Sequence, residues 1–387
     1  MRVCLDVSAA AQARGGIGRY AARLAEALLR LPGIELSLLY HGRGGTALPP
    51  GLAGLPPRRV RLGSKPWRAT LAAASLLRLP LDRVVGPCDL FHATDHVLPP
   101  LRHTPSVFTV HDLAFLAHPE THLRSNRTYL AAMMPRYVAT ATVVIADSEA
   151  TRRDVLARYQ VAPDKVRVVP LGVEPTFAPV PPPEARALVA ARYGLTAPYL
   201  LFVGTLEPRK NLRGLVAAYR ALLQRHDDAP DLAVAGAEGW RYDDLYRLVQ
   251  QEGLSARVRF LGRVADADLP ALYSAAAAFA YPSLYEGFGL PPLEALACGT
   301  PVVCSDRSSL PEVVGDAALL VDPTDAAALA RALARLLDDE ALRRLLRARG
   351  LARAAQFTWA RTAAETLAAY EEARRRWDAR QRTLRGR

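Results

Sequence analysis

The sequence predicts an α/β protein made of two doubly wound, Rossmann-like domains, and three observations support this prediction. Short, branched, apolar segments alternate with Ala/Leu/Arg-rich segments of helical spacing along the chain, as in a parallel sheet covered by helices. A proline-rich stretch interrupts this alternation near the middle, and the alternation then restarts. The length of 387 residues also exceeds that of one ordinary core. We therefore expect one domain over 1–174 and a second that begins at 175.

The first domain is expected to begin with a strand, followed by the helix-patterned segment "GRYAARLAEALLRL" at 18–31. Its further strands are short and rich in branched residues, which suits strands buried on both faces of a parallel sheet. The expected strands of this domain are 2–8, 35–41, 89–94, 106–112, 142–148 and 166–172.

Five prolines between 175 and 183 indicate an extended connector between the domains. After it, apolar strand-like segments again alternate with helix-like ones. The expected strands of the second domain are 199–205, 231–236, 258–264, 277–283 and 300–306. The chain closes with a long helix over 362–387 that carries a basic tail.

The composition indicates a protein that attracts anions. The net charge is +12 and the pI is near 9.9, which leaves phosphorylated small molecules, anionic lipid and nucleic acid open as partners. No apolar run is long enough to span a bilayer and no signal-peptide region opens the chain. The four cysteines lack zinc-ligand spacing and do not indicate a disulfide framework. We expect a cytoplasmic protein.

The loops after the strands deserve inspection because ligands of doubly wound sheets bind at the carboxyl ends of strands. Gly15, Gly16 and Gly18 open a helix after the first strand, so their backbone N–H groups are placed to meet an anion. A tight turn without a ligand explains these glycines equally well. The spacing is not the dinucleotide fingerprint GxGxxG.

Two further loops of the first domain carry polar residues. "FHATDHVLPP" at 91–100 holds His92, Asp95 and His96. Two histidines and an aspartate could suggest a metal, but the surrounding sequence provides no further close ligand cluster, so we interpret the loop as part of an acceptor wall. His111 and Asp112 end another strand, and a histidine there can bond a hydroxyl or exchange a proton. Taken alone, His111 is more simply a structural histidine bonded to the backbone.

The first strand of the second domain leads into "FVGTLEPRKNLRGL" at 202–215. Gly204 and Thr205 permit close approach of the backbone, and Arg209 and Lys210 put two cations just before a helix. A guanidinium fork, a lysine point charge and a helix N-terminus together suit a diphosphate. Lysine occurs only at three positions of this arginine-rich chain, which favours a functional role for Lys210.

The stretch "EGFGLPPLEALACG" places Glu286 and Glu294 eight residues apart. In one helix they would be about 80° apart, but Gly287 and Gly289 disfavour a helix there, and the Pro-Pro pair that follows suits a first helical turn. We therefore expect Glu286 on a loop and Glu294 in a helix that ends near Gly299. Two acids that flank an anion-binding loop match the hydroxyls and diphosphate of a nucleotide sugar.

At this point the residues resemble a known family. "EGFGLPPLEALACGTPVV" resembles the E-x7-E signature of retaining GT-B glycosyltransferases, and the pattern is most similar to bacterial mannosyltransferase-like members of glycosyltransferase group 1. Further segments of the family appear in the right order over nearly the whole chain: "GGIGRYAARLAEAL", "VHDL", "DSEATRRDV", "VPLGVE", "FVGTLEPRKNL", "FLGRV" and "LPEVVGDAALLVDP". The resemblance implies two domains facing across a cleft, with 175–362 binding the nucleotide sugar and a final helix at 363–387 returning to the first domain.

The resemblance also implies roles for individual residues. Arg209 and Lys210 would hold the donor diphosphate, Glu286 would bond the donor sugar near its 3- and 4-hydroxyls, and Glu294 would bond the ribose. His111 would lie near the reacting centre. The remaining positions implied for donor binding are Gly16, Gly204, Thr205, Arg263, Val264, Gly287, Phe288, Gly289 and Leu290, and those on the acceptor side are His92, Asp95 and Asp112.

The implied reaction moves a hexose from a nucleotide-diphosphate sugar to a hydroxyl of a glycan or lipid-linked acceptor, with retention of configuration. No metal or other cofactor is expected, because Arg209, Lys210 and the helix end replace it. The metal-like "DAD" at 266–268 is expected to cap a helix. GDP-mannose is favoured as donor, while UDP-glucose, UDP-GlcNAc and deoxysugar donors stay open.

Two rival functions stay open on the sequence. A nucleotide-sugar 2-epimerase has a similar fold, although "EPRKN" together with E-x7-E argues against it. A non-catalytic nucleic-acid binder is suggested by charge alone, but the chain lacks the interleaved aromatic residues of such proteins; we expect no nucleic-acid partner. The segment 64–83 is expected to be an ordinary packed surface helix, and the positive charge favours weak peripheral attachment to an anionic membrane surface, at the inner face of the plasma membrane.

Overall fold

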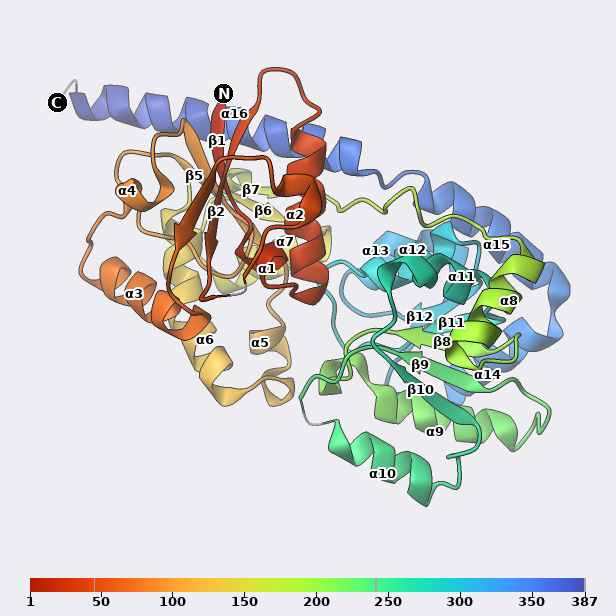
Figure 1. Cartoon of the computed structure of the whole chain (residues 1–387). Coiled ribbons are helices and arrows are strands. Elements are labelled where there is room, and N and C mark those ends of the chain that lie inside the picture. Colours follow the sequence, from red (N-terminus) through yellow and green to blue (C-terminus); the bar gives the residue numbers. More distant parts are fainter. Residues whose placement is uncertain (45, 241, 386–387) are drawn as a thin grey trace. The chain divides into compact units, whose positions relative to one another are not determined.

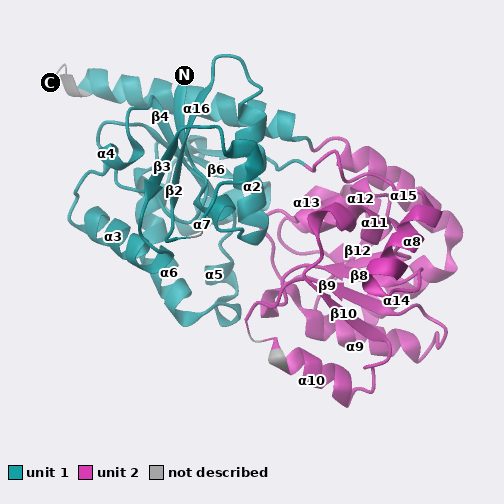
Figure 2. Ribbon diagram, viewed as in Figure 1, with its two compact units in different colours: residues 1–172, 358–387 teal, residues 173–357 magenta. Residues whose placement is uncertain are grey.

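The computed structural model describes residues 1–44, 46–240 and 242–385 and divides the chain into two compact units (Figure 2). The first unit comprises residues 1–172 and 358–387, and the second comprises 173–357. The unit boundaries thus lie just before the expected 174/175 and 362/363. Residues 386–387 of the expected final helix lie outside the described residues. That the domains face across a cleft stays a prediction.

The first unit contains a seven-stranded parallel sheet in the order β3-β2-β1-β4-β5-β6-β7. Six strands were predicted from their branched apolar residues. β3 was missed, because it is a four-residue edge strand that starts with proline and contains two arginines. The strands are β1 (Arg2–Asp6), β2 (Glu35–His41), β3 (Pro57–Val60), β4 (Leu90–Ala93), β5 (Ser106–Val110), β6 (Val143–Ala146) and β7 (Val166–Val168).

Helices flank this sheet, and the long C-terminal helix α16 packs on α2, β5 and β6 of the same unit (Figure 1). A helix that far along the chain therefore belongs to the first unit, as the resemblance implied. The helices are α1 (Ser8–Ala11), α2 (Gly15–Leu28), α3 (Ser64–Leu76), α4 (Asp82–Val85), α5 (Ala114–Ala117), α6 (Arg124–Thr140), α7 (Glu149–Arg158) and α16 (Trp359–Arg385).

The second unit contains a six-stranded parallel sheet in the order β10-β9-β8-β11-β12-β13. β13 was not predicted as a strand. The strands are β8 (Leu200–Val203), β9 (Leu232–Ala235), β10 (Val258–Gly262), β11 (Ala278–Tyr281), β12 (Val302–Ser305) and β13 (Ala318–Val321). The helices are α8 (Pro182–Tyr193), α9 (Leu212–Leu223), α10 (Asp243–Gln251), α11 (Leu269–Ser274), α12 (Leu290–Ala297), α13 (Leu310–Val314), α14 (Ala326–Asp338) and α15 (Glu340–Ala354). Both sheets are thus doubly wound, as predicted.

The proline-rich stretch is not a free connector. It lies inside the second unit, where Phe177 is buried against Tyr273 and the Val180 amide donates to Ser274 Oγ. Its last two prolines open helix α8, where a missing N–H costs nothing. The prolines therefore fix an extended path along the surface of this unit.

Two helix predictions can be compared with the structure. Asp268 precedes α11, but its carboxylate does not cap that helix, because it accepts bonds from Arg192 and Tyr193 instead. Helix α3, within 64–83, is a packed surface helix as expected, with Trp67 and Leu71 buried. No helix of the described residues is both long and apolar enough to cross a membrane.

Candidate functional site

The strand order of the second unit reverses between β8 and β11, and their following loops are joined there. The Leu284 amide, after β11, donates to the Arg209 carbonyl, after β8, at 2.9 Å. Adjacent parallel strands that send their crossovers to opposite faces leave a ligand-binding crevice at this point. The sequence-predicted residues of both loops therefore meet at one sheet edge.

Four charged side chains form a buried cluster at this edge, which we call the Glu286 cluster: Glu207, Arg209, Lys210 and Glu286. Glu286 Oε2 accepts a bond from Arg209 Nη1 at 2.8 Å, and its Oε1 accepts one from Lys210 Nζ at 2.6 Å. Arg209 Nη2 donates to Glu207 Oε1 at 2.6 Å. The cations that the sequence assigns to a diphosphate are thus paired with carboxylates in this structure.

Hydroxyl groups complete the shell of Glu286. Ser283 Oγ and Tyr281 OH donate to its Oε1 at 2.6 and 3.1 Å, and Lys210 Nζ also donates to Tyr281 OH at 2.7 Å. Tyr281 is the last residue of β11 and is fully buried. Tyr281, at the end of a central strand, therefore holds the side chains of Lys210 and Glu286 in place next to each other.

Glu286 is charged in this setting. Burial alone would raise the pKa of its carboxyl, but the charges of Arg209 and Lys210 outweigh burial and bring the pKa to about 2. Burial, with the neighbouring Arg209 charge, lowers the pKa of Lys210 from its ordinary value. Two cations and two carboxylates make the cluster neutral, which balances the cost of burying the charges.

The loop between Glu286 and α12 has an unusual backbone that its sequence explains. Gly289 precedes α12 with φ of 112°, a region that favours glycine. Pro291 and Pro292 follow in the first turn and offer no N–H, so backbone donors near this helix end come from the residues before them. Ser309 Oγ fixes this loop by donating to the carbonyls of Glu286 and Phe288.

Glu286 and Glu294 take the predicted positions, one on a loop and one in a helix. Glu294 lies in α12, which ends just before Gly299 as expected. Its carboxylate is buried and Oε2 accepts a bond from Tyr273 OH at 2.9 Å. Binding of ribose by Glu294 stays a prediction.

The other predicted donor residues also follow strands of the second unit. Gly204 and Thr205 follow β8, and Arg263 and Val264 follow β10. Gly204 is approached closely by Gly236, after β9, where a Cβ would lie 1.8 Å from the Gly204 carbonyl oxygen. This contact explains a glycine at position 236, which the sequence did not single out.

The carboxyl edge of the first unit's sheet holds a buried ion pair. His111, after β5, bonds through Nδ1 to Asp147 Oδ2, after β6, at 2.6 Å. Its Nε2 bonds to the Thr94 carbonyl at 2.8 Å. Burial would lower the pKa of His111, but Asp147 outweighs burial and raises the pKa to about 9.

The predicted acceptor-side residues fall into two groups. Asp95 is buried and paired with Arg14 at 2.9 Å, and Asp112 lies partly exposed beside His111. His92, in contrast, is fully buried, and both ring nitrogens are bonded, to Tyr370 OH and to Thr109 Oγ1. The assignment of His92 to an acceptor wall is therefore corrected: it is a residue of the packed interior.

The glycine loop of the first unit was expected to approach an anion at Gly16. Gly16 is exposed in α2, and a Cβ there would meet nothing within 4 Å. At Gly18 a Cβ would lie 2.8 Å from the Ala9 carbonyl oxygen. Packing therefore requires glycine at position 18, while contact of Gly16 with a diphosphate stays a prediction.

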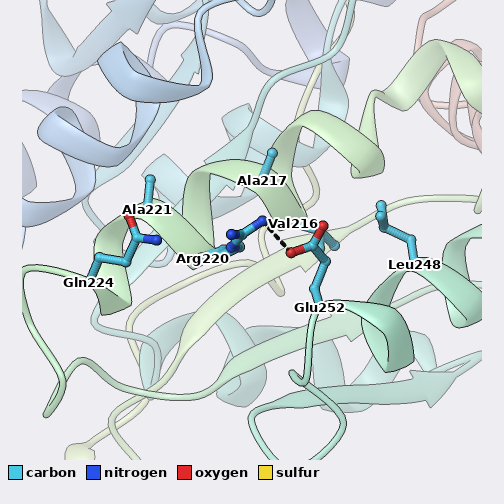
Figure 3. Close-up of a pocket in the computed structure, with 7 residues that line it drawn as sticks. All are labelled: Val216, Ala217, Arg220, Ala221, Gln224, Leu248 and Glu252. Carbon is cyan, nitrogen blue, oxygen red and sulfur yellow. Dashed lines mark hydrogen bonds and ion pairs between the residues drawn. The ribbon is translucent and has the colours of Figure 1, made fainter.

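Outside these two sheet edges, the described residues form a pocket but no metal-binding cluster. In the part of the chain that the structure describes, no group of three or more His, Cys, Asp or Glu side chains could hold a metal ion. A pocket of about 270 Å³ lies between α9 and α10, where Arg220 pairs with Glu252 and the apolar Val216 and Leu248 also line the wall (Figure 3). It contains none of the predicted site residues.

The family of the chain follows from two family models that together match most of its length. Residues 14–177 match the family described as "Glycosyltransferase Family 4", and residues 192–353 match "Glycosyl transferases group 1". The chain belongs to the group 1 glycosyltransferases. The Glu286 cluster lies within the group 1 match, and the His111–Asp147 pair lies within the other.

This glycosyltransferase matches different shares of the length of its curated relatives. "O-antigen chain mannosyltransferase B" of Escherichia coli is 34% identical over 371 residues, 92% of this chain and 96% of the relative. "D-inositol 3-phosphate glycosyltransferase" of Salinispora tropica is 36% identical over 80% of this chain and 69% of the relative. The chain spans only 32% of the E. coli "Serotype-specific mannosyltransferase WbdA", at 33% identity over 67% of this chain.

Solved structures show the same GT-B fold as this glycosyltransferase. Sucrose-phosphate synthase from Thermosynechococcus elongatus has a TM-score of 0.78 at 24% identity and covers 96% of this chain and 98% of its own. WaaG, a glycosyltransferase involved in lipopolysaccharide biosynthesis, has a TM-score of 0.72 at 19% identity and covers 95% and 98%. At these identities, the structural similarity shows that the fold is shared.

Sequence reasoning missed several residues of this glycosyltransferase that the structure places at the two edges. Tyr281 and Ser283 lie within five residues of Glu286, and Glu207 is two residues before Arg209. Asp147 had a usable signal, since it ends an apolar strand at a position equivalent to His111. Asp6 had the same signal, and it is buried at the end of β1, where burial raises its carboxyl pKa to about 6.

Proposed function

We propose that this glycosyltransferase moves a hexose, with mannose favoured, from a nucleotide-diphosphate sugar to a hydroxyl of a glycan or lipid-linked acceptor. The Glu286 cluster carries the proposal, because it gathers two cations and a charged carboxylate at the switch point of the second sheet. The mannosyltransferase relatives support mannose and a role in polysaccharide assembly. GDP-mannose is the donor we favour.

The geometry of Glu286 supports its binding to hydroxyls of the donor sugar. Its Oε1 already accepts three bonds, from Lys210, Ser283 and Tyr281, whereas the bond from Arg209 falls on Oε2. A carboxylate oxygen accommodates about two acceptor bonds. We therefore assign the sugar hydroxyls to Oε2, with the remaining contacts holding the carboxylate in place.

Arg209 and Lys210 are suited to stabilise the departing nucleotide diphosphate. Their side chains are only 14% and 11% exposed, and electrostatic interactions are stronger where water is excluded. Both cations are held by the protein before a donor arrives, so little reorganisation is needed as negative charge develops on the leaving oxygen. We propose that this replaces a metal ion and that the anomeric configuration is retained.

We also propose a cytoplasmic, peripheral location in which the basic chain meets an anionic membrane surface. The net charge of +12 supports electrostatic attraction. Exposed Leu76 ends helix α3 of the first unit, and exposed Leu77 and Leu79 follow it. This surface would bring a lipid-linked acceptor near the enzyme.

Nucleotide release from a panel of sugar donors tests the proposal. The protein is incubated with GDP-, UDP-, ADP- and dTDP-sugars and lipid-linked acceptors in the presence of EDTA. We expect release from one donor, a glycosylated acceptor with retained configuration by NMR, and loss of release in Lys210→Ala. Lys165→Ala is the matched control. Lys165 belongs to the first unit and lies just before β7, at the amino end of that strand and away from the carboxyl ends where the predicted site residues lie.

Three results would contradict parts of the proposal. If no donor of the panel released its nucleotide, the result would contradict the proposed transferase activity. An inverted anomeric centre, or a requirement for a divalent ion, would contradict retention or metal independence. An epimerised nucleotide sugar without acceptor modification would favour the epimerase instead.

A further inference from the structure

We propose that Asp147 is a positioning residue that keeps His111 as an imidazolium, so that His111 acts as a stationary positive charge and not as a proton carrier. The inference rests on the glycosyl transfer proposed above and on the position near the reacting centre that the family resemblance implies for His111. It concerns contacts within the first unit alone.

Both ring nitrogens of His111 face acceptors. Nδ1 meets the Asp147 carboxylate at 2.6 Å and Nε2 meets the Thr94 carbonyl at 2.8 Å. A carbonyl oxygen can only accept, and a neutral imidazole carries one N–H. Both bonds are satisfied together with a charged Asp147 only when both nitrogens are protonated.

A second buried histidine shows that the partners decide the charge. His92 lies on the neighbouring strand β4 and is equally buried, but its nitrogens meet the hydroxyls of Tyr370 and Thr109. A hydroxyl can donate or accept, so neutral His92 is satisfied. Burial accordingly lowers the pKa of His92 to about 3, while the carboxylate of Asp147 reverses the effect of burial at His111.

Burial raises the pKa of the Asp147 carboxyl, and the charge and hydrogen bond of His111 oppose burial and favour the charged form of Asp147. Asp147 stands just before Ser148, the N-cap of α7, where the helix dipole favours a negative charge. Its Oδ1 is buried and has no hydrogen-bond partner, so the contact with His111 through Oδ2 is the interaction that offsets its burial. The pair therefore depends on both members.

Several other titratable groups lie near His111 and affect whether its ring is charged. Asp95 favours the charge on His111, whereas His92 and His96 oppose charge there. Tyr20 of α2 contacts the ring edge-on at a centroid distance of 4.9 Å. The groups that face the pair are Asp95, His96, His92, Asp112 and Tyr20.

The arrangement limits what His111 can do chemically. A general base needs a nitrogen lone pair directed at the substrate, and both nitrogens are committed to the protein. A fixed imidazolium instead contributes a preorganised charge, which costs no reorganisation during reaction. His111 is expected to lower the energy of developing negative charge near it.

Titration of His111 in the Asp147→Asn variant tests the inference. In the full-length protein with isotope-labelled histidine, NMR should show His111 protonated through neutral pH and titrating near 9. In Asp147→Asn the pKa of His111 should fall by more than about two pH units, since the carboxylate no longer opposes the effect of burial. Transfer by the variant should show a new loss of rate as pH rises through neutrality, and Asp147→Glu should restore the wild-type pH profile.

Asp89→Asn is the control, because it also removes a carboxylate from an ion pair, with Arg2, before β4 at the other edge of the sheet. It should leave the His111 titration unchanged. A wild-type His111 that is neutral at pH 7, or an Asp147→Asn titration equal to wild type, would overturn the inference. If the pKa of His111 fell in Asp147→Asn but the pH profile of transfer stayed that of the wild type, the proposed role of the His111 charge in the reaction would be overturned. Absence of any donor turnover would instead refute the proposed function, and the NMR titrations would still decide the state of His111.

Discussion

Replacing Glu286 by glutamine should strongly destabilise the second unit. The substitution keeps the shape of the side chain but leaves Arg209 and Lys210 buried with one carboxylate, Glu207, between them. Removing one member of a buried ion pair typically costs about 3–5 kcal/mol, because the remaining charge is uncompensated.

The pKa of Glu286 gives a second measure of the same effect. A fall from the ordinary 4.5 to about 2 corresponds to about 3 kcal/mol in favour of the charged form, at ~1.4 kcal/mol per pKa unit. Because the folded pKa is the lower one, this stabilisation is fully present above pH 4.5 and is lost as the pH falls toward 2. The two magnitudes agree at about 3 kcal/mol.

Pulsed hydrogen exchange against urea, read on peptides from β11 and α12, measures the stability of this unit directly. With a urea dependence of about 1–3 kcal/mol per molar, the midpoint for Glu286→Gln should fall by about 1 M or more. Combining Glu286→Gln with Lys210→Met should recover part of the loss, since one uncompensated cation is then removed.

Glu340→Gln is the matched control for this experiment. It makes the same chemical change in an exposed pair with Arg344 of the same unit, and solvent screens such pairs. Its midpoint should equal that of the wild type. An unchanged midpoint for Glu286→Gln as well would refute the electrostatic coupling that we infer for the cluster.

Four further substitutions test local contacts, each by the urea midpoint of the unit concerned, with Gly16→Ala serving as a control. Gly236→Ala should destabilise by about 1–3 kcal/mol because its Cβ meets a backbone oxygen, whereas Gly16→Ala should not, since nothing lies within 4 Å; equal midpoints would contradict the close approach. Tyr370→Phe should cost about 1–3 kcal/mol by leaving buried His92 Nδ1 unpaired, and a neutral result would exclude that bond. Ser148→Ala should cost about 1 kcal/mol by removing the cap of α7, measurable in the same way.

Much of the second-unit site could be predicted from sequence because its residues are close together along the chain. Glycines and prolines between Glu286 and Glu294 forbid one continuous helix, so their placement on a loop and a helix follows from local backbone restrictions. Arg209 and Lys210 follow a strand, which fixes the sheet edge at which they lie. The structure adds that these cations are neutralised by Glu207 and Glu286 before any ligand binds.

The sequence could not assign roles to the buried histidines. His92 lies within an apolar strand and His111 directly follows one, and the sequence suggested functional roles for both. Their partners, Tyr370 for one and Asp147 for the other, lie 278 and 36 residues away along the chain. Only the packing of α16 and the pairing of β5 with β6 decide which histidine is neutral and which is charged.

The sequence by itself determined the two doubly wound sheets, nearly all of their strands and the loops that carry the charged residues. These features depend on apolar periodicity and on the backbone limits of glycine and proline, which act over a few neighbouring residues. Tertiary structure alone decided the edge strands β3 and β13, the packing of the proline-rich stretch on the second unit and the charge states of Glu286, His92 and His111. A charge state depends on burial and on partners brought together from distant segments, and a local pattern contains neither.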